Sequence, residues 1–412
     1  MAQQQLFQHT YPNGLTLLAE RLDHVRSATF YFLIPSGFTY DSPPTLGMSS
    51  VLAEMLTRGA GERDSKQLSL ALDNLGTDRS ESVGSFNIVL SAGTLARNVP
   101  AALAIYADII RRPHLPEDEL AAVQDLLLQD ILGLEDSPQE KVILELKSRY
   151  YPSPLNRNRY GTTEGIQAIQ ASDVKAHYGN RFQARGAILS VAGAIDWPAL
   201  QKQVGELFGD WPGRDEPEPV IESHTPLSTH LLKDTQQTQI ALAFPSASFT
   251  DPDYYAARGA VGVLSGGMSS RLFTEVREKR GLCYSVYASH DTVKDRGAMI
   301  CYAGTRADRA QETLDVTVGE LRRLKDGVTV EELDRLKASL KTSLVMSQES
   351  TSSRASSMAT DWFYLRRVRT VDEVQAAINA LTTGQILHYL ERFPVKDLTV
   401  VTLGPEALKL PE

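Results

Sequence analysis

The spacing of apolar residues divides the first half of the chain into short strands and amphipathic helices. Strands are predicted at 16–20, 30–34 and 187–193, where apolar runs have strand length. Helices are predicted at 45–58, 64–75, 98–111, 116–135, 137–150, 171–182 and 196–208, where apolar residues recur with a helical period. Strands near both ends with helices between them predict an α+β domain, a mainly antiparallel sheet layered by helices on one face.

One polar segment near the middle of the chain interrupts this periodicity. Residues 211–226 read WPGRDEPEPVIESHTP and contain four prolines and four acidic residues. Such a composition is typical of an extended, semi-rigid linker. The sequence therefore predicts an N-terminal domain at 1–212, a linker at 213–227 and a C-terminal domain at 228–412.

The two halves on either side of this linker resemble each other. Three pairs of segments recur in the same order, 210 or 211 positions apart: ATFYFLIPSGFTYDSP (28–43) and QIALAFPSASFTDPDY (239–254), AHYGNRF (176–182) and LHYLERF (387–393), GAILSVAG (186–193) and DLTVVTLG (397–404). This order and spacing predict two copies of one fold. His177 and His388 recur within the second pair, which favours packing or capping roles over metal binding.

Composition narrows the class of protein. The chain has 412 residues, 42% hydrophobic and 23% charged, with a net charge of -9 and a pI near 5.5. These values are typical of a globular protein and argue against a nucleic-acid or anionic-membrane surface, which needs a basic face. We expect a soluble protein, cytoplasmic or periplasmic. The N-terminus has no secretion signal, although a leader removed earlier would leave the same start.

The two cysteines, Cys283 and Cys301, form no C-x-x-C motif and cannot build a disulfide framework. They are interpreted as buried small hydrophobes, or at most one bridge. The sequence also contains no G-x-S-x-G, phosphate-loop or G-x-G-x-x-G motif.

Residues 47–59, GMSSVLAEMLTRG, carry the frame of a metal-binding helix without its ligands. In H-x-x-E-H, a helix places two imidazoles on one face to hold zinc and a glutamate beside the metal-bound water. The surrounding frame G-x-x-H-x-x-E-H-M-x-x-[KR]-G can be placed from Gly47 to Gly59. The three working positions then hold Ser50, Ala53 and Glu54.

This frame and the segment GGMSSRLFTEVREKRGLCYSVYA (266–288) resemble the pitrilysin-like (inverzincin) zinc peptidases, which include insulin-degrading enzyme and mitochondrial processing peptidase. The resemblance extends over essentially the whole chain. It implies that Arg277 and Tyr284, seven residues apart, contact substrate near the cleavage site. It also places the third metal ligand, a glutamate in the family pattern E-R-x-V-x-x-x-E, at Asp130, with the supporting glutamate replaced by Val123.

These replacements predict that the chain holds no metal. Glu54 and Asp130 would offer two carboxylates without an imidazole, which is a poor zinc site. The eight histidines, at 9, 24, 114, 177, 224, 230, 290 and 388, provide no pair spaced by three or four residues. We therefore expect no cofactor in this chain and zinc in a partner subunit.

The resemblance then implies a specific role. Because the metal positions are lost and the Arg277–Tyr284 pair is kept, the chain is similar to the metal-free subunit of heterodimeric bacterial or mitochondrial-processing-type peptidases. Such a subunit is inactive alone and supplies substrate-binding residues and half of a peptide chamber to a homologous H-x-x-E-H partner. The expected partners are that subunit and a peptide, with no nucleic acid and no membrane. By the same resemblance, residues 265–270 are expected to form a flexible loop near bound peptide.

Two other functions remain open at this stage. One is a non-proteolytic scaffold or peptide-binding homodimer of the same fold. The other is an enzyme that uses Glu54 or Asp130 as a general acid or base.

Overall fold

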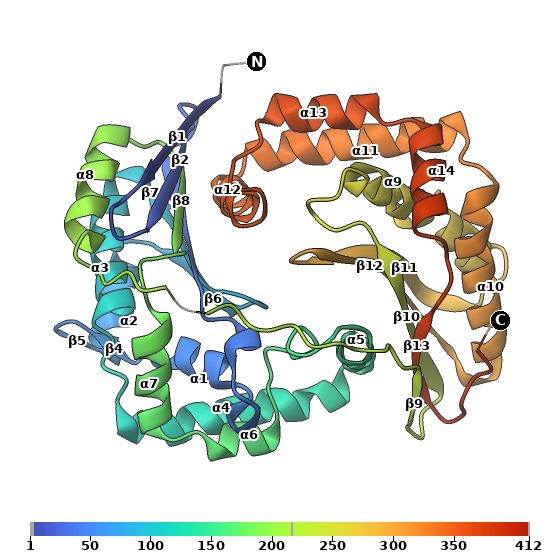
Figure 1. Cartoon of the computed structure of the whole chain (residues 1–412), viewed down its shortest axis with the longest axis horizontal. Helices are drawn as coiled ribbons and strands as arrows, with labels where there is room; N and C mark the ends of the chain where they lie inside the picture. The colour runs from blue at the N-terminus through green and yellow to red at the C-terminus, as the bar shows by residue number, and fades with distance from the viewer. Residues whose placement is uncertain (1–3, 216, 411–412) are drawn as a thin grey trace. The chain divides into compact units, whose positions relative to one another are not determined.

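The structure is a computed structural model that describes residues 4–215 and 217–410. The chain forms two compact units (Figure 1). Unit 1 consists of Met1–Gly133, Arg157–Val220 and Met346–Thr370, and unit 2 of Leu134–Asn156, Ile221–Val345 and Val371–Glu412. The units differ from the halves on either side of the linker, because each unit includes a segment from the other half.

Within the described residues, unit 1 is built on a six-stranded sheet with the order β1-β2-β8-β3-β7-β6. Its strands are β1 (Gln5–Thr10), β2 (Thr16–Arg21), β3 (Ser27–Ile34), β6 (Asp78–Val83), β7 (Ile88–Leu95) and β8 (Ile188–Gly193). The β2–β8 pair is parallel and the other pairs are antiparallel. The three strands predicted from the sequence are β2, β3 and β8, whereas β1 and the β6–β7 hairpin were not predicted.

Unit 2 is built on a sheet with the order β11-β12-β10-β13-β9, five strands in the described part of the chain. Its strands are β9 (Thr229–Leu232), β10 (Gln237–Ser246), β11 (Cys283–Val293), β12 (Arg296–Arg306) and β13 (Thr399–Gly404). The β8 and β13 strands are equivalent, since each lies between one parallel and one antiparallel neighbour. The predicted duplication of an α+β fold is confirmed.

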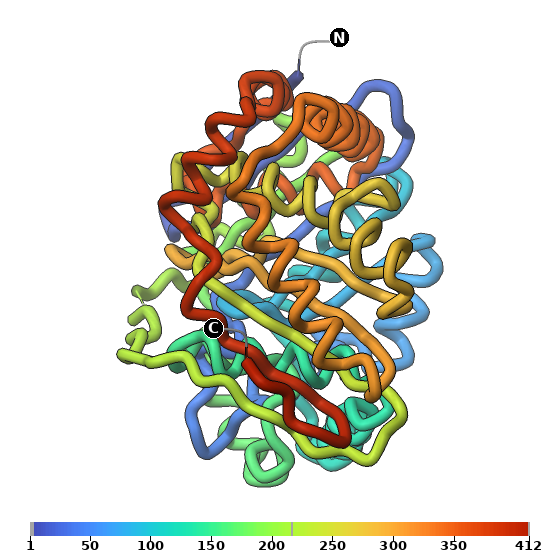
Figure 2. Tube along the Cα trace, turned by 90° about the vertical axis from the view of Figure 1, so that its right-hand side faces the viewer, coloured from blue at the N-terminus to red at the C-terminus, as the bar shows by residue number. Residues whose placement is uncertain are grey.

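Helices cover one face of each sheet and form the two main cores. In unit 1 these helices are α1 (Met48–Met55), α2 (Ser65–Asn74), α3 (Val99–Arg111), α4 (Leu120–Gly133), α6 (Thr163–Ala168), α7 (Ala171–Arg181) and α8 (Trp197–Phe208); a short β4–β5 ladder (Gly59–Ala60 and Arg63–Asp64) lies among them. In unit 2 they are α9 (Tyr254–Ser265), the π-helix η6 (Phe273–Glu278), α10 (Ala310–Arg323), α11 (Val330–Gln348), α13 (Val371–Ala380) and α14 (Thr383–Arg392). Figure 2 faces unit 2 and shows α10 and α14 beside its strands.

The opposite face of each sheet carries one helix from the other half of the sequence. In unit 1, α12 (Thr351–Leu365) packs on β2, β3 and β8. A buried ion pair joins Arg354 Nε to Glu20 Oε2 at 2.6 Å, and Thr351 Oγ1 lies 2.8 Å from Thr29 Oγ1. The unit 1 sheet is therefore covered on both faces, and the helix on this second face comes from a segment distant in sequence.

In unit 2 the corresponding helix is α5 (Pro138–Tyr150), which packs on β10 and β13 (Figure 1). Asp291 on β11 connects the sheet to this segment by accepting from Lys147 Nζ and from the Tyr151 hydroxyl, both at 2.7 Å. The sequence predicted this helix but not the sheet that it covers.

The duplicated serines bind the duplicated helices in both units. Ser36 Oγ lies 3.1 Å from His177 Nε2 in unit 1, and Ser246 Oγ lies 2.7 Å from the Tyr389 hydroxyl in unit 2. Burial lowers the pKa of His177 to about 4, with the Arg181 charge acting in the same direction. His177 therefore has the predicted packing role, whereas His388 is exposed and faces Glu391.

Both cysteines are buried and free. Burial raises the pKa of Cys283 to about 11 and that of Cys301 to about 12, so both thiols are neutral at physiological pH. Among the helices of the described residues, none is both long and apolar enough to cross a membrane.

Candidate functional site

The helix that carries the degenerate metal frame begins at a rigid turn. Gly47 precedes α1 with a φ of 106°, and a Cβ at this position would lie 2.8 Å from Ile166. The Asp41 carboxylate accepts from the backbone N–H of Gly47 at 2.9 Å, and from the N–H and hydroxyl of Ser49 at 3.0 and 2.6 Å. Burial raises the pKa of Asp41 to about 6, although these hydrogen bonds oppose the shift. These hydrogen bonds fix the start of α1, the helix on which the metal frame was predicted.

The working positions of the frame belong largely to the core. Ser50 is 8% exposed and donates its hydroxyl to the Arg159 carbonyl at 2.5 Å, and Ala53 is 6% exposed. Glu54 is half-buried beside β6. Burial raises the pKa of Glu81 on that strand, and the Glu54 carboxylate acts in the same direction.

The third position lies on α4, which packs against α1. Asp130 is exposed on this helix, whereas Val123, at the supporting position, is fully buried. In the described part of the chain, no three His, Cys, Asp or Glu side chains are grouped so that they could hold a metal ion. Ser50 is already bonded to a carbonyl and Ala53 has no donor atom, so this set of residues does not fit zinc.

The predicted substrate pair is assembled in unit 2. Arg277 lies on the π-helix η6, and its guanidinium stacks 5.0 Å from the ring centre of Tyr284 and 4.8 Å from that of Phe273. Within the described residues no carboxylate lies within ion-pair distance of Arg277, so its N–H donors remain available to a ligand. π-helical turns are frequent at functional sites.

The seven-residue spacing is explained by the turn after η6. Gly281 has a φ of 58°, and its N–H donates to the Arg277 carbonyl at 3.0 Å. The chain then enters β11, where the register shifts between Cys283 and Ser285. Tyr284 occupies this bulge and is 84% exposed. The turn and the bulge return Tyr284 to Arg277 and direct it away from the core.

The bulge also changes which residues of β11 face the core. On a regular strand, Cys283 and Val286 would point to opposite faces, since they are three positions apart. Both pack against the same core cluster in unit 2. The alternation of core-facing and outward-facing side chains along β11 is therefore shifted by one residue at Tyr284. Tyr284 is the extra residue, and its side chain does not pack in the core.

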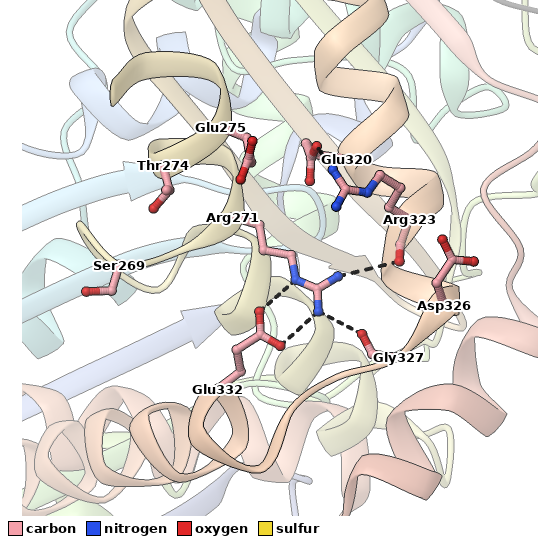
Figure 3. Close-up of a pocket in the computed structure, with 9 residues that line it drawn as sticks. All are labelled: Ser269, Arg271, Thr274, Glu275, Glu320, Arg323, Asp326, Gly327 and Glu332. Carbon is pink, nitrogen blue, oxygen red and sulfur yellow. Dashed lines mark hydrogen bonds and ion pairs between the residues drawn. The ribbon is translucent and has the colours of Figure 1, made fainter. Parts of the chain in front are cut away.

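A partly buried ion pair holds the segment that leads into η6 (Figure 3). Arg271 donates through Nε and Nη2 to the two carboxylate oxygens of Glu332, at 2.7 and 2.8 Å, and through Nη2 to the Gly327 carbonyl at 2.7 Å. These residues line a polar cavity of about 410 Å³ that also includes the buried Glu320 carboxylate, paired with Arg323. A bidentate Arg–carboxylate pair has a defined geometry, so it fixes this segment against α11.

Sequence reasoning missed the Arg271–Glu332 pair because the two residues are 61 positions apart and belong to no motif. The tract 265–270 connects α9 to this segment, with Gly267 at a φ of 140° and Met268 73% exposed. Its flexibility and its proximity to peptide stay predictions.

Comparison with known families identifies the scaffold. The family described as Insulinase (Peptidase family M16) matches residues 17–163, and the family described as Peptidase M16 inactive domain matches residues 168–340. The chain belongs to peptidase family M16. The predicted pitrilysin-like membership is thereby confirmed for most of this M16 chain.

Full-length relatives carry peptidase names. A protein from Bacillus subtilis named as an uncharacterized zinc protease is 28% identical over 407 residues, covering 96% of this M16 chain and 98% of the relative. A protein of the same kind of name from Rickettsia bellii is 26% identical over 402 residues, covering 96% and 97%.

Two solved structures show the same fold. A peptidase M16 inactive domain from Pseudomonas fluorescens superposes with a TM-score of 0.91 at 23% identity, covering 99% of both chains. A protease from Helicobacter pylori superposes with a TM-score of 0.90 at 20% identity, covering 98% of this chain and all of that one. At these identities the likeness establishes the M16 fold of the whole chain.

Proposed function

We propose that this M16 chain is the metal-free subunit of a heterodimeric zinc peptidase. It contributes Arg277, Tyr284 and half of the peptide chamber to a homologous partner that holds zinc in an H-x-x-E-H helix. One contrast carries the proposal. The positions of the metal frame hold side chains that do not fit zinc, while Arg277 and Tyr284 are assembled with an exposed phenol and free guanidinium donors.

The pair suits an extended peptide. A guanidinium offers several N–H donors in a fixed fork, and a phenol offers one directional O–H, so both can donate to peptide carbonyls. The cation–π contact between Arg277 and Tyr284 restricts both side chains before a ligand arrives. Such pre-ordering lowers the entropic cost of holding a peptide in register over a catalytic centre in the partner.

The decisive experiment measures kcat/KM of the reconstituted heterodimer with Arg277→Ala and with Tyr284→Phe. Tyr284→Phe keeps the ring on which Arg277 stacks and removes only the hydroxyl. Each change should lower kcat/KM on the order of tenfold to a thousandfold, because one positioned donor is lost in the transition state. Dimer formation by size exclusion and zinc content of the partner should be unchanged.

Arg280→Ala is the matched control. Arg280 is three residues from Arg277 and is bound to Glu275 at 2.9 Å, outside the stacked pair. Its loss should change kcat/KM only about twofold, as expected for an exposed ion pair. Wild-type kinetics for both pair variants would contradict the proposal and leave the non-proteolytic scaffold or peptide-binding homodimer.

A further inference from the structure

A second cavity in unit 2 lies beside strand β11 and takes no part in the Arg277–Tyr284 site. It has a volume of about 520 Å³ and lies between the first half of α5 and Tyr287. Its lining residues are Ser137, Pro138, Gln139, Glu140, Ile143, Leu144, Lys147 and Tyr287. Pockets for small ligands and side-chain groups commonly measure roughly 300–1,000 Å³.

Two of the polar side chains around this cavity already have partners. Gln139 Nε2 donates to the Tyr287 hydroxyl at 3.2 Å, and Lys147 Nζ is bound to Asp291 at 2.7 Å. The Tyr287 ring packs on Tyr302, with ring centres 5.3 Å apart. The walls left for a ligand are therefore mainly the apolar surfaces of Ile143, Leu144 and the Tyr287 ring.

The two aliphatic wall residues are half-buried and belong to α5, a helix that other residues fix to the sheet. Val142 and Leu146 of α5 are fully buried, and α5 packs on β10 and β13. Ile143 and Leu144 flank this buried stripe and remain partly open. The cavity is thus held by a fixed helix and a fixed strand, and this rigidity favours recognition by shape.

The cavity and the substrate pair share strand β11. Tyr284 and Tyr287 are three residues apart, about 10 Å at the rise of a strand. An extended peptide has nearly the same rise, so a residue held at Tyr284 would have a neighbour about three positions away beside Tyr287.

We propose that this cavity binds a bulky apolar side chain of the peptide, about three residues from the one held at Tyr284. The inference rests on the proposed function and specifies its substrate class: peptides with a large apolar residue at one fixed position. Such a side chain gains free energy by leaving water and needs no charge, because the walls that remain open are mainly the apolar surfaces of Ile143, Leu144 and the Tyr287 ring.

The test measures peptide binding to this chain alone by fluorescence anisotropy, without the partner or zinc. The probe is a short fluorescein-labelled peptide with a single Phe in an Ala/Ser background, compared with its Ser counterpart. The wild-type chain should bind the Phe peptide roughly tenfold more tightly, as burial of one large apolar side chain would give. Equal affinities for the two peptides would overturn the proposal.

Two variants of one cavity residue sharpen the test. Leu144→Trp fills the cavity and should abolish the preference for Phe, while Leu144→Glu should transfer the preference to a Lys peptide. A gain of Lys binding is a result that a misfolded protein cannot give. Leu232→Trp is the matched control, because Leu232 is 79% exposed on β9, at the opposite edge of the same sheet. A Phe preference that survives in folded Leu144→Trp would contradict the proposal.

A measurement on the unmodified chain covers the case in which both variants fail to fold. A peptide carrying p-benzoylphenylalanine in place of Phe should crosslink to α5 and β11, as mapped by mass spectrometry. Crosslinks confined to other segments would overturn the inference. Failure here is distinguishable from failure of the proposed function, since the latter appears as unchanged cleavage by the Arg277→Ala heterodimer.

Discussion

The two copies of the fold have equivalent strands but differ where chemistry is expected. In both copies a glycine with positive φ precedes the edge strand, Gly76 before β6 and Gly281 before β11. The β6 strand pairs with β7 in continuous register, whereas β11 has a bulge that displaces Tyr284. The duplicated core thus preserves the turn, while one extra residue in one strand creates an exposed site in the second copy only.

The helices that cross between the halves show a second difference. Arg354 and Glu20, which join α12 to its sheet, have side chains only 7% and 5% exposed. Lys147 and Asp291, which join α5 to its sheet, are 36% and 21% exposed. Since water screens the second pair more, α12 should depend on its ion pair more strongly than α5 does.

The largest loss of stability is expected when the buried Arg354–Glu20 pair is broken. Arg354→Ala leaves the Glu20 carboxylate buried without its cation and should lower the free energy of unfolding of unit 1 by about 3–5 kcal/mol. All three tryptophans, at 197, 211 and 362, belong to unit 1, so denaturant unfolding followed by tryptophan fluorescence reports on it. The double variant Arg354→Met with Glu20→Leu should recover most of the loss. A loss below about 1 kcal/mol for Arg354→Ala, typical of an exposed pair, would show that burial is not decisive.

A pH effect should distinguish the two serine contacts. The pKa of His177 is about 4 in the folded state and near 6.5 when unfolded, so the unfolded chain binds the proton first as pH falls. Stability should therefore decrease from pH 6.5 to pH 4 by up to about 3 kcal/mol through this residue. The comparison with His177→Gln isolates the effect, because the opposite contribution of Asp41 is common to both proteins.

The equivalent contact in unit 2 provides the control. Burial raises the pKa of Tyr389 to about 12, so its hydroxyl stays neutral across the same pH range. Tyr389→Phe should leave the slope of stability between pH 4 and 6.5 unchanged, whereas His177→Gln should flatten it. Equal slopes for wild type and His177→Gln would contradict the role of His177.

A smaller effect is expected for the half-exposed pair on α5. Asp291→Ala removes the partner of Lys147 and of the Tyr151 hydroxyl and should destabilise unit 2 by about 1–2 kcal/mol. Hydrogen exchange of α5 and β10 measures this locally. A loss equal to that of Arg354→Ala would remove the distinction between the two crossing helices.

The smallest effect is expected on peptidase activity, when the family's metal-binding residues are introduced into this chain. The variant with Ser50→His, Ala53→Glu, Glu54→His and Asp130→Glu should bind some zinc. Its activity alone should stay about a hundredfold below that of the proposed heterodimer, because the supporting position holds the buried Val123 in place of a glutamate. Elemental analysis and a peptidase assay measure both properties. Full turnover by the variant alone would show that the partner is dispensable.

The sequence alone predicted those helices and strands whose own residue pattern shows which face is buried. The apolar period of 171–182 predicted α7, and the apolar run of 187–193 predicted β8. The polar strand β6, DRSESV, has no such signal and forms because it pairs with β7, so it was missed. The site residues Arg277 and Tyr284 could be named from their motif, but their contact depends on a π-helix and a bulge that no local pattern specifies.

The sequence by itself determined the duplicated α+β fold and its main helices and strands, and it predicted that Ser50 and Ala53 stand where metal ligands would be expected. These properties follow from periodicity, repeated segments and residue chemistry, all of which are local or additive along the chain. Only the tertiary structure decided that α5 and α12 each cover the sheet formed mainly by the other half. This placement depends on contacts between residues hundreds of positions apart, such as the ion pair of Arg354 with Glu20, which no local sequence pattern specifies.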